Sequence, residues 1–272
     1  MILIDGHAHA SIHAMDRGLA YGDGVFRTLR TAAGQPLWWA HQFAKLSADC
    51  RALSLACPDE RLLHEEVCRV AQAGAGETVV KIMVTRGAGT RGYAYTDDHA
   101  STRIVFSAPL PAHARPDAPR DIAARWCALR LGHQPRLAGV KHLNRLENVL
   151  ARSEWDDPAV LEGILCDETG AVVSGVMSNL VWMKNGALYT PDLQACGVAG
   201  VARARILRAA ARQGIATHIG LWRPDVILAA DEVMVCNSVM GVRRVAKLDG
   251  AAWTSAAWTQ HWNDALHEEG ST

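Results

Sequence analysis

The chain has 272 residues, of which 28 are basic and 28 acidic, so its formal net charge is zero. A neutral protein has no overall field that attracts nucleic acid or an anionic membrane, so any anionic ligand needs a local site. The seven cysteines are scattered and never spaced C-x-x-C, which argues against a zinc knuckle or a disulfide framework. No apolar run approaches the roughly 18 residues of a membrane span, and no basic leader precedes the first strand-like residues. We therefore expect a cytoplasmic protein.

The first part of the chain alternates between strand-like and helical patterns. Residues 25–39 are typical of a hairpin that turns at Ala33-Gly34, whereas residues 41–55 and 59–74 carry apolar side chains at helical spacing. The elements predicted here, in order, are a short strand at 2–4, the hairpin at 25–39, helices at 41–55 and 59–74, and strands at 79–87 and 102–108.

A proline-rich stretch, APLPAHARPDAPRD at residues 108–121, holds four of the ten prolines. Because proline fixes φ and removes a backbone donor, this stretch reads as a linker. We expect a small N-terminal domain over residues 1–112, a linker over 113–121 and a larger domain over 122–272.

The larger segment mixes strands, hairpins and helices. Asn185-Gly186 is the strongest short hairpin signal in the chain. The predicted elements are a strand at 124–131, a helix at 143–155, hairpins at 163–175 and 179–191, a helix at 200–214, a strand at 216–222, a short helix at 224–231, a strand at 233–238 and a final helix. The fold class is α+β, with two domains of mixed sheet and helix.

Three histidines, His7, His9 and His13, stand just after the first strand-like residues. An H-x-H pair at such a place begins the metal site of one class of hydrolases. That class needs further ligands, yet none of the remaining histidines pairs at H-x-x-x-H spacing or in a ligand pattern with a carboxylate. The predicted hairpins also contradict a barrel of eight strand–helix units. A metal site at His7 and His9 is the weaker alternative, and we expect no metal.

Five other stretches form a consistent set. They are DRGLAYGDGVFRTLR at 16–30, RGAGTRGY at 86–93, KHLNRLENVLAR at 141–152, GVAGVAR at 197–203 and CNSVMGV at 236–242. With these motifs in this order, the sequence resembles the fold-type IV, or class IV aminotransferase-like, pyridoxal-phosphate enzymes over nearly its whole length. Within that family it is most similar to the aminodeoxychorismate lyases. The resemblance implies a small N-terminal α/β domain and a larger cofactor-binding domain with a mixed-sheet, barrel-like core.

The resemblance assigns the cofactor lysine to Lys141. From position alone, Lys141 is an amine between a strand and a helix behind apolar neighbours, where desolvation lowers an ammonium pKa and favours Schiff-base chemistry. The resemblance places the phosphate at the backbone N–H groups of Val201 and Ala202, with the Ser238 hydroxyl and Asn237. A glycine-containing turn at a helix start suits an anion on physical grounds as well.

Two positions depart from the family pattern. Lys45 stands where the family has an arginine that reaches the phosphate, and lysine cannot bind phosphate bidentately. Ser174 stands where the family has a glutamate that pairs with the pyridine nitrogen, in the stretch SGVMSN at 174–179. A hydroxyl cannot stabilise the ring nitrogen's proton, so the cofactor becomes a poorer electron sink. This loss should harm a transaminase more than a lyase, because aromatisation drives release of 4-aminobenzoate and pyruvate.

Arginines and one strand face suggest where the substrate binds. The resemblance implies that Arg86 and Arg91, in a glycine-rich loop, meet two substrate carboxylates, for which guanidinium forks are suited. Strand alternation places Phe26, Thr28 and Arg30 on one face, which we expect to border the substrate ring. The resemblance also implies a homodimer and a role in folate synthesis. Two alternatives stay open: a class IV aminotransferase for branched-chain or D-amino acids, and a nearly inactive cofactor-binding protein.

Overall fold

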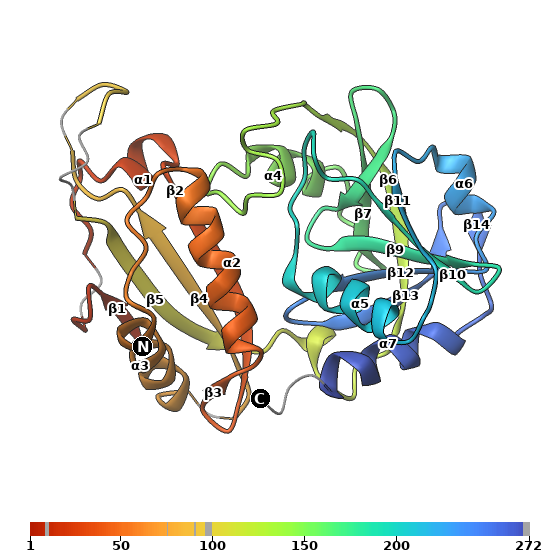
Figure 1. Cartoon of the computed structure of the whole chain (residues 1–272), viewed down its shortest axis with the longest axis horizontal. Coiled ribbons are helices and arrows are strands. Elements are labelled where there is room, and N and C mark those ends of the chain that lie inside the picture. The colour runs from red at the N-terminus through yellow and green to blue at the C-terminus, as the bar shows by residue number, and fades with distance from the viewer. Residues whose placement is uncertain (9–10, 75, 90, 96–99, 269–272) are drawn as a thin grey trace. The chain divides into compact units, whose positions relative to one another are not determined.

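The computed structural model describes residues 1–8, 11–74, 76–89, 91–95 and 100–268 (Figure 1). The chain folds into two compact units. Unit 1 comprises Met1–Ala112 and Val140–Asn144, and unit 2 comprises His113–Gly139 and Arg145–Thr272. The expected α+β fold with two mixed domains is confirmed, although the boundary is more complex than a single linker.

Unit 1 is a five-stranded sheet in the order β1-β5-β4-β2-β3, with helices packed on it. Its elements are β1 (Ile2–Ile4), α1 (Arg17–Tyr21), β2 (Gly24–Ala32), β3 (Gln35–Pro36), α2 (Trp39–Ala52), α3 (Glu60–Gln72), β4 (Thr78–Thr85) and β5 (Thr102–Pro109). The β2–β3 hairpin turns where the sequence predicts, with Ala33 and Gly34 both at positive φ. Such a turn matches the right-handed twist of the paired strands.

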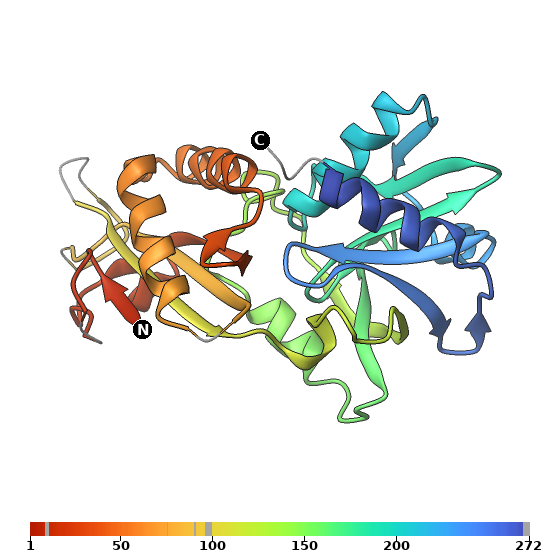
Figure 2. The ribbon, with the colours of Figure 1, turned by 90° about the horizontal axis from the view of Figure 1, so that it is seen from below.

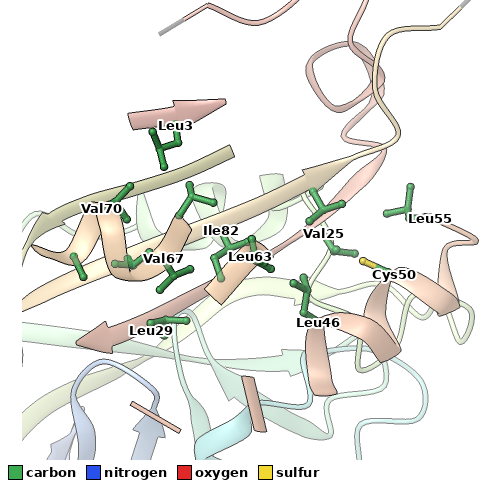
Figure 3. Packing of buried hydrophobic residues seen from close by; sticks show 14 of the residues in the cluster. Leu3, Val25, Leu29, Leu46, Cys50, Leu55, Leu63, Val67, Val70 and Ile82 are labelled. Carbon is green, nitrogen blue, oxygen red and sulfur yellow. The ribbon is translucent and has the colours of Figure 1, made fainter. Parts of the chain in front are cut away.

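The core of unit 1 lies between the sheet and helices α2 and α3. Figure 3 shows Leu29 and Ile82 from the central strands in one cluster with Val67 of α3 and Leu46 of α2. These side chains are fully or almost fully buried. Each such aliphatic group contributes about 1.5–3 kcal/mol relative to exposure, so this layer holds the helices against the strands.

Unit 2 contains a nine-stranded sheet in which eight strands follow the order β11-β10-β9-β12-β13-β6-β7-β8, with β14 paired to β13. Val172 of β8 forms an antiparallel bridge with Trp222, which lies just after β11. The Val172 N–H donates to the Trp222 carbonyl at 2.8 Å. The two ends of the strand order therefore meet, which gives the barrel-like core that the family resemblance implies. Figure 2 shows α7 beside α5 over this sheet.

The elements of this second unit, after the short 3-10 helix η1 (Ala112–Ala114), are β6 (Asp121–Leu131), α4 (Leu146–Arg152), β7 (Val160–Asp167), β8 (Val172–Gly175), β9 (Asn179–Lys184), β10 (Ala187–Pro191), α5 (Val201–Arg212), β11 (Thr217–Gly220), α6 (Pro224–Leu228), β12 (Glu232–Asn237), β13 (Gly241–Leu248), β14 (Ala251–Ala252) and α7 (Ala257–Glu268). None of the helices in the described ranges is long and apolar enough to cross a bilayer.

Two expectations need correction. The stretch 113–121 belongs to unit 2, while Val140–Asn144 belongs to unit 1, so Lys141 lies outside the larger domain in which the sequence placed it. The helix expected over 143–155 begins only at Leu146. The reason is local: the Asn144 side chain donates to the Gly22 carbonyl at 3.2 Å, and Arg145 has a non-helical φ of −118°.

Candidate active site

Lys141 is fixed in unit 1 as part of a short segment that pairs with the start of β2. The Phe26 N–H donates to the Lys141 carbonyl at 2.9 Å, and the Leu143 N–H donates to the Gly24 carbonyl at 2.9 Å. Val25 and His142 form the antiparallel bridge between these bonds. The backbone at Lys141 is therefore held like a strand residue, and its half-buried amine is presented from a rigid base.

The Lys141 amine lies against an aromatic face. Its Nζ is 4.4 Å from the centroid of the Phe26 ring, and Nζ of Lys81 on β4 is 4.9 Å from the same centroid. Phe26, Thr28 and Arg30 are half-buried and alternate with fully buried neighbours, so the predicted shared face is confirmed. Sequence reasoning missed Lys81. The sequence feature that could have indicated Lys81 is its place as the single lysine inside the apolar run VVKIMV.

Asp49 on α2 is a second residue that the sequence did not reveal. Its carboxylate is 2% exposed, accepts from the Arg27 guanidinium at 3.0 Å and pairs with the Lys45 ammonium. The Lys141 backbone N–H donates to the same carboxylate at 3.3 Å. Burial lowers the pKa of both Arg27 and Lys45, and the charge of Asp49 acts in the opposite direction.

This arrangement gives Lys45 a role besides the one that its position in the family pattern implies. Its ammonium is engaged with Asp49 one turn along the same helix. It therefore helps to neutralise the buried carboxylate that also binds the Lys141 backbone N–H, and its predicted contact with the phosphate stays a prediction.

The glycines of the motif Gly22-Asp23-Gly24 make room for the lysine segment. Gly22 has φ +65°, and a Cβ there would lie 2.5 Å from Asn144 Oδ1. A Cβ on Gly24 would lie 2.5 Å from the Val84 carbonyl oxygen and 2.7 Å from the Leu143 side chain. Two motifs separated by more than a hundred residues therefore fit together because neither glycine has a side chain.

The Arg86 guanidinium is bound by other groups of the protein. Its guanidinium binds both carboxylate oxygens of Asp23, at 2.8 and 3.1 Å, and donates to the carbonyls of Leu53 and Ser54 at 2.8 Å each. Burial raises the pKa of Asp23, but Arg86 and Arg17 outweigh it and leave the pKa below its usual value. Since these bonds use four of the donor directions of Arg86, the prediction that it binds a substrate carboxylate does not fit the structure.

The other two predicted arginines lie in different surroundings. Arg30 forms an ion pair with Glu77, so it too has a protein partner. Arg91 lies exposed in the loop between β4 and β5. Of the three predicted substrate arginines, Arg91 is the one for which the structure shows no internal role within the described residues.

In unit 2, the predicted phosphate-binding residues Val201 and Ala202 form the first turn of α5. The helix cap is Gly200, and within the described chain no side chain caps this turn. Asn179 shapes the approach, accepting from the Gly200 N–H at 3.0 Å and donating to the Val198 carbonyl at 2.8 Å. Backbone N–H groups and the positive end of a 12-residue helix thus remain for an anion, and a phosphate group fits this chemistry.

Asn237 and Ser238 follow β12 in the same unit. The Asn237 side chain accepts from the N–H groups of Val239 and Met240 at 2.9 Å each, and donates to the Met177 carbonyl at 3.1 Å. Asn237 therefore shapes the turn that carries Ser238, and its own side chain is occupied.

Ser174 is 6% exposed on β8, opposite Leu165 of β7. A Cβ on the next residue, Gly175, would lie 2.7 Å from the carboxyl group of Glu162. Successive strand residues point to opposite faces, so Ser174 points away from Glu162. Glu162 therefore does not substitute for the glutamate that the family carries at the Ser174 position.

Glu162 instead holds the loop that follows β8. Its carboxyl group accepts from the Ser178 hydroxyl at 2.6 Å and from the N–H groups of Gly163 and Val176 at 3.0 and 2.9 Å. Burial raises the pKa of Glu162 to about 7, although these hydrogen bonds lower it. The groups that lower this pKa are hydrogen-bond donors and not basic side chains, so Glu162 is a buried acid stabilised by dipoles.

Two of the three N-terminal histidines, His7 and His13, lie among the described residues. His7 pairs with Ile4 in a turn, and the Met15 N–H donates to Nδ1 of His13 at 3.1 Å, whereas His9 lies outside the described residues. Over the described ranges, no group of three metal-ligating side chains includes His7 or His13.

Comparison with known proteins identifies the family of the chain. The family model for amino-transferase class IV matches residues 24–248. The chain belongs to the class IV aminotransferase family. The chain is 32% identical over 248 residues to aminodeoxychorismate lyase of Vibrio harveyi, and the alignment covers 90% of each sequence. It is similar to the crystal structure of 4-amino-4-deoxychorismate lyase from Pseudomonas aeruginosa, with 40% identity, a TM-score of 0.92 and 99% of both chains covered. A hypothetical aminotransferase from Mycobacterium tuberculosis in a PLP-bound form, at 21% identity and a TM-score of 0.85, shares the class IV fold over 100% of this chain and 99% of its own.

Proposed function

We propose that this protein is a pyridoxal-phosphate-dependent 4-amino-4-deoxychorismate lyase, which converts its substrate to 4-aminobenzoate and pyruvate for folate synthesis. The observation that carries the proposal is the rigid presentation of Lys141 over Phe26, beside a second lysine, Lys81. The 40% identity to a lyase over the full length supports it.

The proposal gives roles to the residues that hold the cofactor. When bound, pyridoxal phosphate supplies an aldehyde that bonds to amines and a ring that withdraws electrons. Lys141 is the amine that holds the cofactor and moves protons. It accepts the proton lost from the substrate ring carbon while the carbon–oxygen bond to enolpyruvate breaks, and enolpyruvate gains a proton to become pyruvate. The Val201 and Ala202 N–H groups bind the phosphate, with Ser238 on the turn that Asn237 shapes.

Substrate recognition rests on cations near the Phe26 face. The substrate has two carboxylates, and Lys81 lies on this face while Arg91 lies in the adjoining loop after β4. Thr28 stands opposite Lys81 in the β2–β4 pairing. We assign carboxylate binding to Lys81 and Arg91, in place of the Arg86 and Arg30 expected from the sequence.

The second candidate is a class IV aminotransferase for branched-chain or D-amino acids, since the family is that of the class IV aminotransferases and relatives at 28% and 25% identity are a putative branched-chain-amino-acid aminotransferase and a D-alanine aminotransferase. Ser174 favours the lyase over this candidate. Without an anionic group at that position, the ring nitrogen of the cofactor is not held protonated, and a transaminase relies on that protonation more than an aromatising elimination does.

A homodimer is part of the proposal. On α4, Leu146, Val149 and Leu150 are 74%, 61% and 59% exposed, at the i, i+3 and i+4 positions of one helix face. An apolar stripe of this kind is typical of a subunit interface.

The seven cysteines are free thiols, which fits a cytoplasmic protein.

The decisive experiment follows pyruvate release from 4-amino-4-deoxychorismate without any keto acid. The wild type and Lys247→Ala, which changes an exposed lysine, should release pyruvate. Lys141→Ala should lose at least about 10²–10⁴-fold of the rate, the contribution of acid–base catalysis alone. Borohydride reduction followed by peptide mapping should locate the cofactor on Lys141. No pyruvate from this substrate, together with amino transfer from a branched-chain or D-amino acid to an added keto acid, would favour the aminotransferase, and unchanged turnover by Lys141→Ala would refute the assignment.

A further inference from the structure

Three segments of unit 2 bring together a histidine, an aspartate and a cysteine that have no role in the proposed function. His133 follows β6, Asp167 ends β7, and Cys196 lies between β10 and α5. One ligand atom from each lies within 4.8 Å of the other two. The closest pair is His133 Nε2 and Asp167 Oδ2, at 2.8 Å.

The surrounding backbone fixes the aspartate. Oδ1 of Asp167 accepts from the N–H groups of Thr169 and Ala171, at 2.9 Å each, and from the Thr169 hydroxyl at 2.7 Å. This leaves Oδ2 directed toward His133. The loops carrying the histidine and the cysteine are also joined, because the Gln134 N–H donates to the Ala195 carbonyl at 2.9 Å.

Cys196 is the unusual member of the group. It is 8% exposed, and in the part of the chain that the structure describes its thiol has no hydrogen-bond partner. Apolar neighbours account for its burial, since it belongs to the core cluster with Leu193. They do not account for a sulfur atom facing an imidazole and a carboxylate. Glu147 and Glu168 add further negative charge near this thiol, which attracts a cation.

We propose that His133, Asp167 and Cys196 form a binding site for a borderline-soft divalent cation of the Zn²⁺ class. Imidazole nitrogen, carboxylate oxygen and thiolate sulfur are the ligands that Zn²⁺ takes in proteins, and a water completes four-coordination. On binding, the thiol proton leaves to solvent, and the cation replaces the hydrogen bond between Nε2 and Oδ2. The imidazole proton then resides on Nδ1, where Oε1 of Glu168 lies 3.5 Å away and orients the ring.

The site lies close in sequence to the turn that precedes α5. Gly197 follows Cys196, and its carbonyl accepts from the Gly139 N–H at 2.9 Å. A bound cation would link this turn to the ends of β6 and β7. Metal binding itself does not depend on the proposed lyase activity, so the two proposals can fail separately.

The test titrates chelator-treated full-length protein with Co²⁺, which reports cysteine ligation by a thiolate charge-transfer band, and then displaces it with Zn²⁺. The matched control is Cys68→Ser, because the Cys68 sulfur lies 3.7 Å from Nε2 of His64 in unit 1 and is more accessible. Wild type and Cys68→Ser should bind one Co²⁺ per chain with the band and gain thermal stability.

Cys196→Ser should lose the band, and His133→Gln, which keeps a hydrogen-bonding group beside Asp167, should bind at least about 100-fold more weakly. Circular dichroism and the melting temperature of each metal-free variant show whether it is folded. A band that persists in Cys196→Ser and vanishes in Cys68→Ser would overturn the proposal, as would the absence of stoichiometric Co²⁺ and Zn²⁺ binding by the wild type.

Discussion

Replacing Asp49 by asparagine should destabilise unit 1 strongly, because the substitution keeps the shape and removes the charge. The Arg27 side chain is 3% exposed, and that of Lys45 is 22% exposed. In Asp49→Asn both cations would face a neutral amide. Its N–H₂ group is itself a donor and cannot accept hydrogen bonds from them. The Lys141 N–H would compete with them for the single remaining carbonyl oxygen.

The expected loss of unfolding free energy follows from the burial of the ion pair between Arg27 and Asp49. Breaking a buried pair by neutralising one partner costs about 3–5 kcal/mol, since the other charge remains uncompensated. Lys45 is partly solvated and contributes little, so the lower end of the range, about 3 kcal/mol, applies to Arg27 alone. For a chain of this size each kcal/mol lowers the melting temperature by about 2–4 °C, which predicts a fall of about 6–12 °C.

The assay compares thermal and urea unfolding of the wild type, Asp49→Asn and the control Glu65→Gln. Glu65 pairs with Arg61 at the same i,i+4 spacing on an exposed face, so its change should stay within about 0.5 kcal/mol. The double variant Asp49→Asn with Arg27→Met should recover stability, because it removes the orphaned charge. If Asp49→Asn is no worse than Glu65→Gln, or if the double variant is no better than Asp49→Asn, the reasoning is wrong.

Three further outcomes follow from unit 2. Because burial raises the pKa of Glu162 from 4.5 to about 7, the native state keeps a proton that the unfolded chain loses, so stability should fall by up to about 3 kcal/mol as pH rises from 4.5 to 7. Glu162→Gln should flatten that slope in melting curves, and an unchanged slope would contradict the shift. Gly175→Ala should lower the melting temperature, since its Cβ would collide with Ser178, whereas Gly250→Ala has open space and should not; equal values would argue against the collision. Ser174→Glu should raise an aminotransferase half-reaction far more than pyruvate release at matched cofactor occupancy, and equal gains would mean that Ser174 does not face the ring nitrogen.

Local patterns predicted the framework well. Helical spacing located α2 and α3, and the turn residues Ala33 and Gly34 located the first hairpin. The alternation of Phe26 with its neighbours also predicted a shared face correctly. Each of these features depends on residues close together in the chain, so the sequence itself contains the information.

Long-range pairing is what the sequence could not show. Arg86 reads as a free cation in a glycine-rich loop, yet its partner Asp23 stands 63 residues earlier. Asp49 reads as a solvated helix residue, because nothing near it in sequence indicates that Arg27 lies underneath. The strand β13 was missed as well, since its run of Arg243 and Arg244 interrupts the apolar pattern that predicts a buried strand.

The return of Val140–Asn144 to unit 1 has a consequence for synthesis on the ribosome. Residues 1–112 emerge first, yet the segment bearing Lys141 follows 27 residues that belong to unit 2, His113–Gly139. At about 5–20 residues per second, this interval lasts a few seconds. During that time β2 lacks its Lys141 segment, and Asp49 lacks one of its three donors. A nascent chain arrested before Val140 would carry the sheet of unit 1 without the proposed reactive amine, so premature termination there yields a protein without lyase activity.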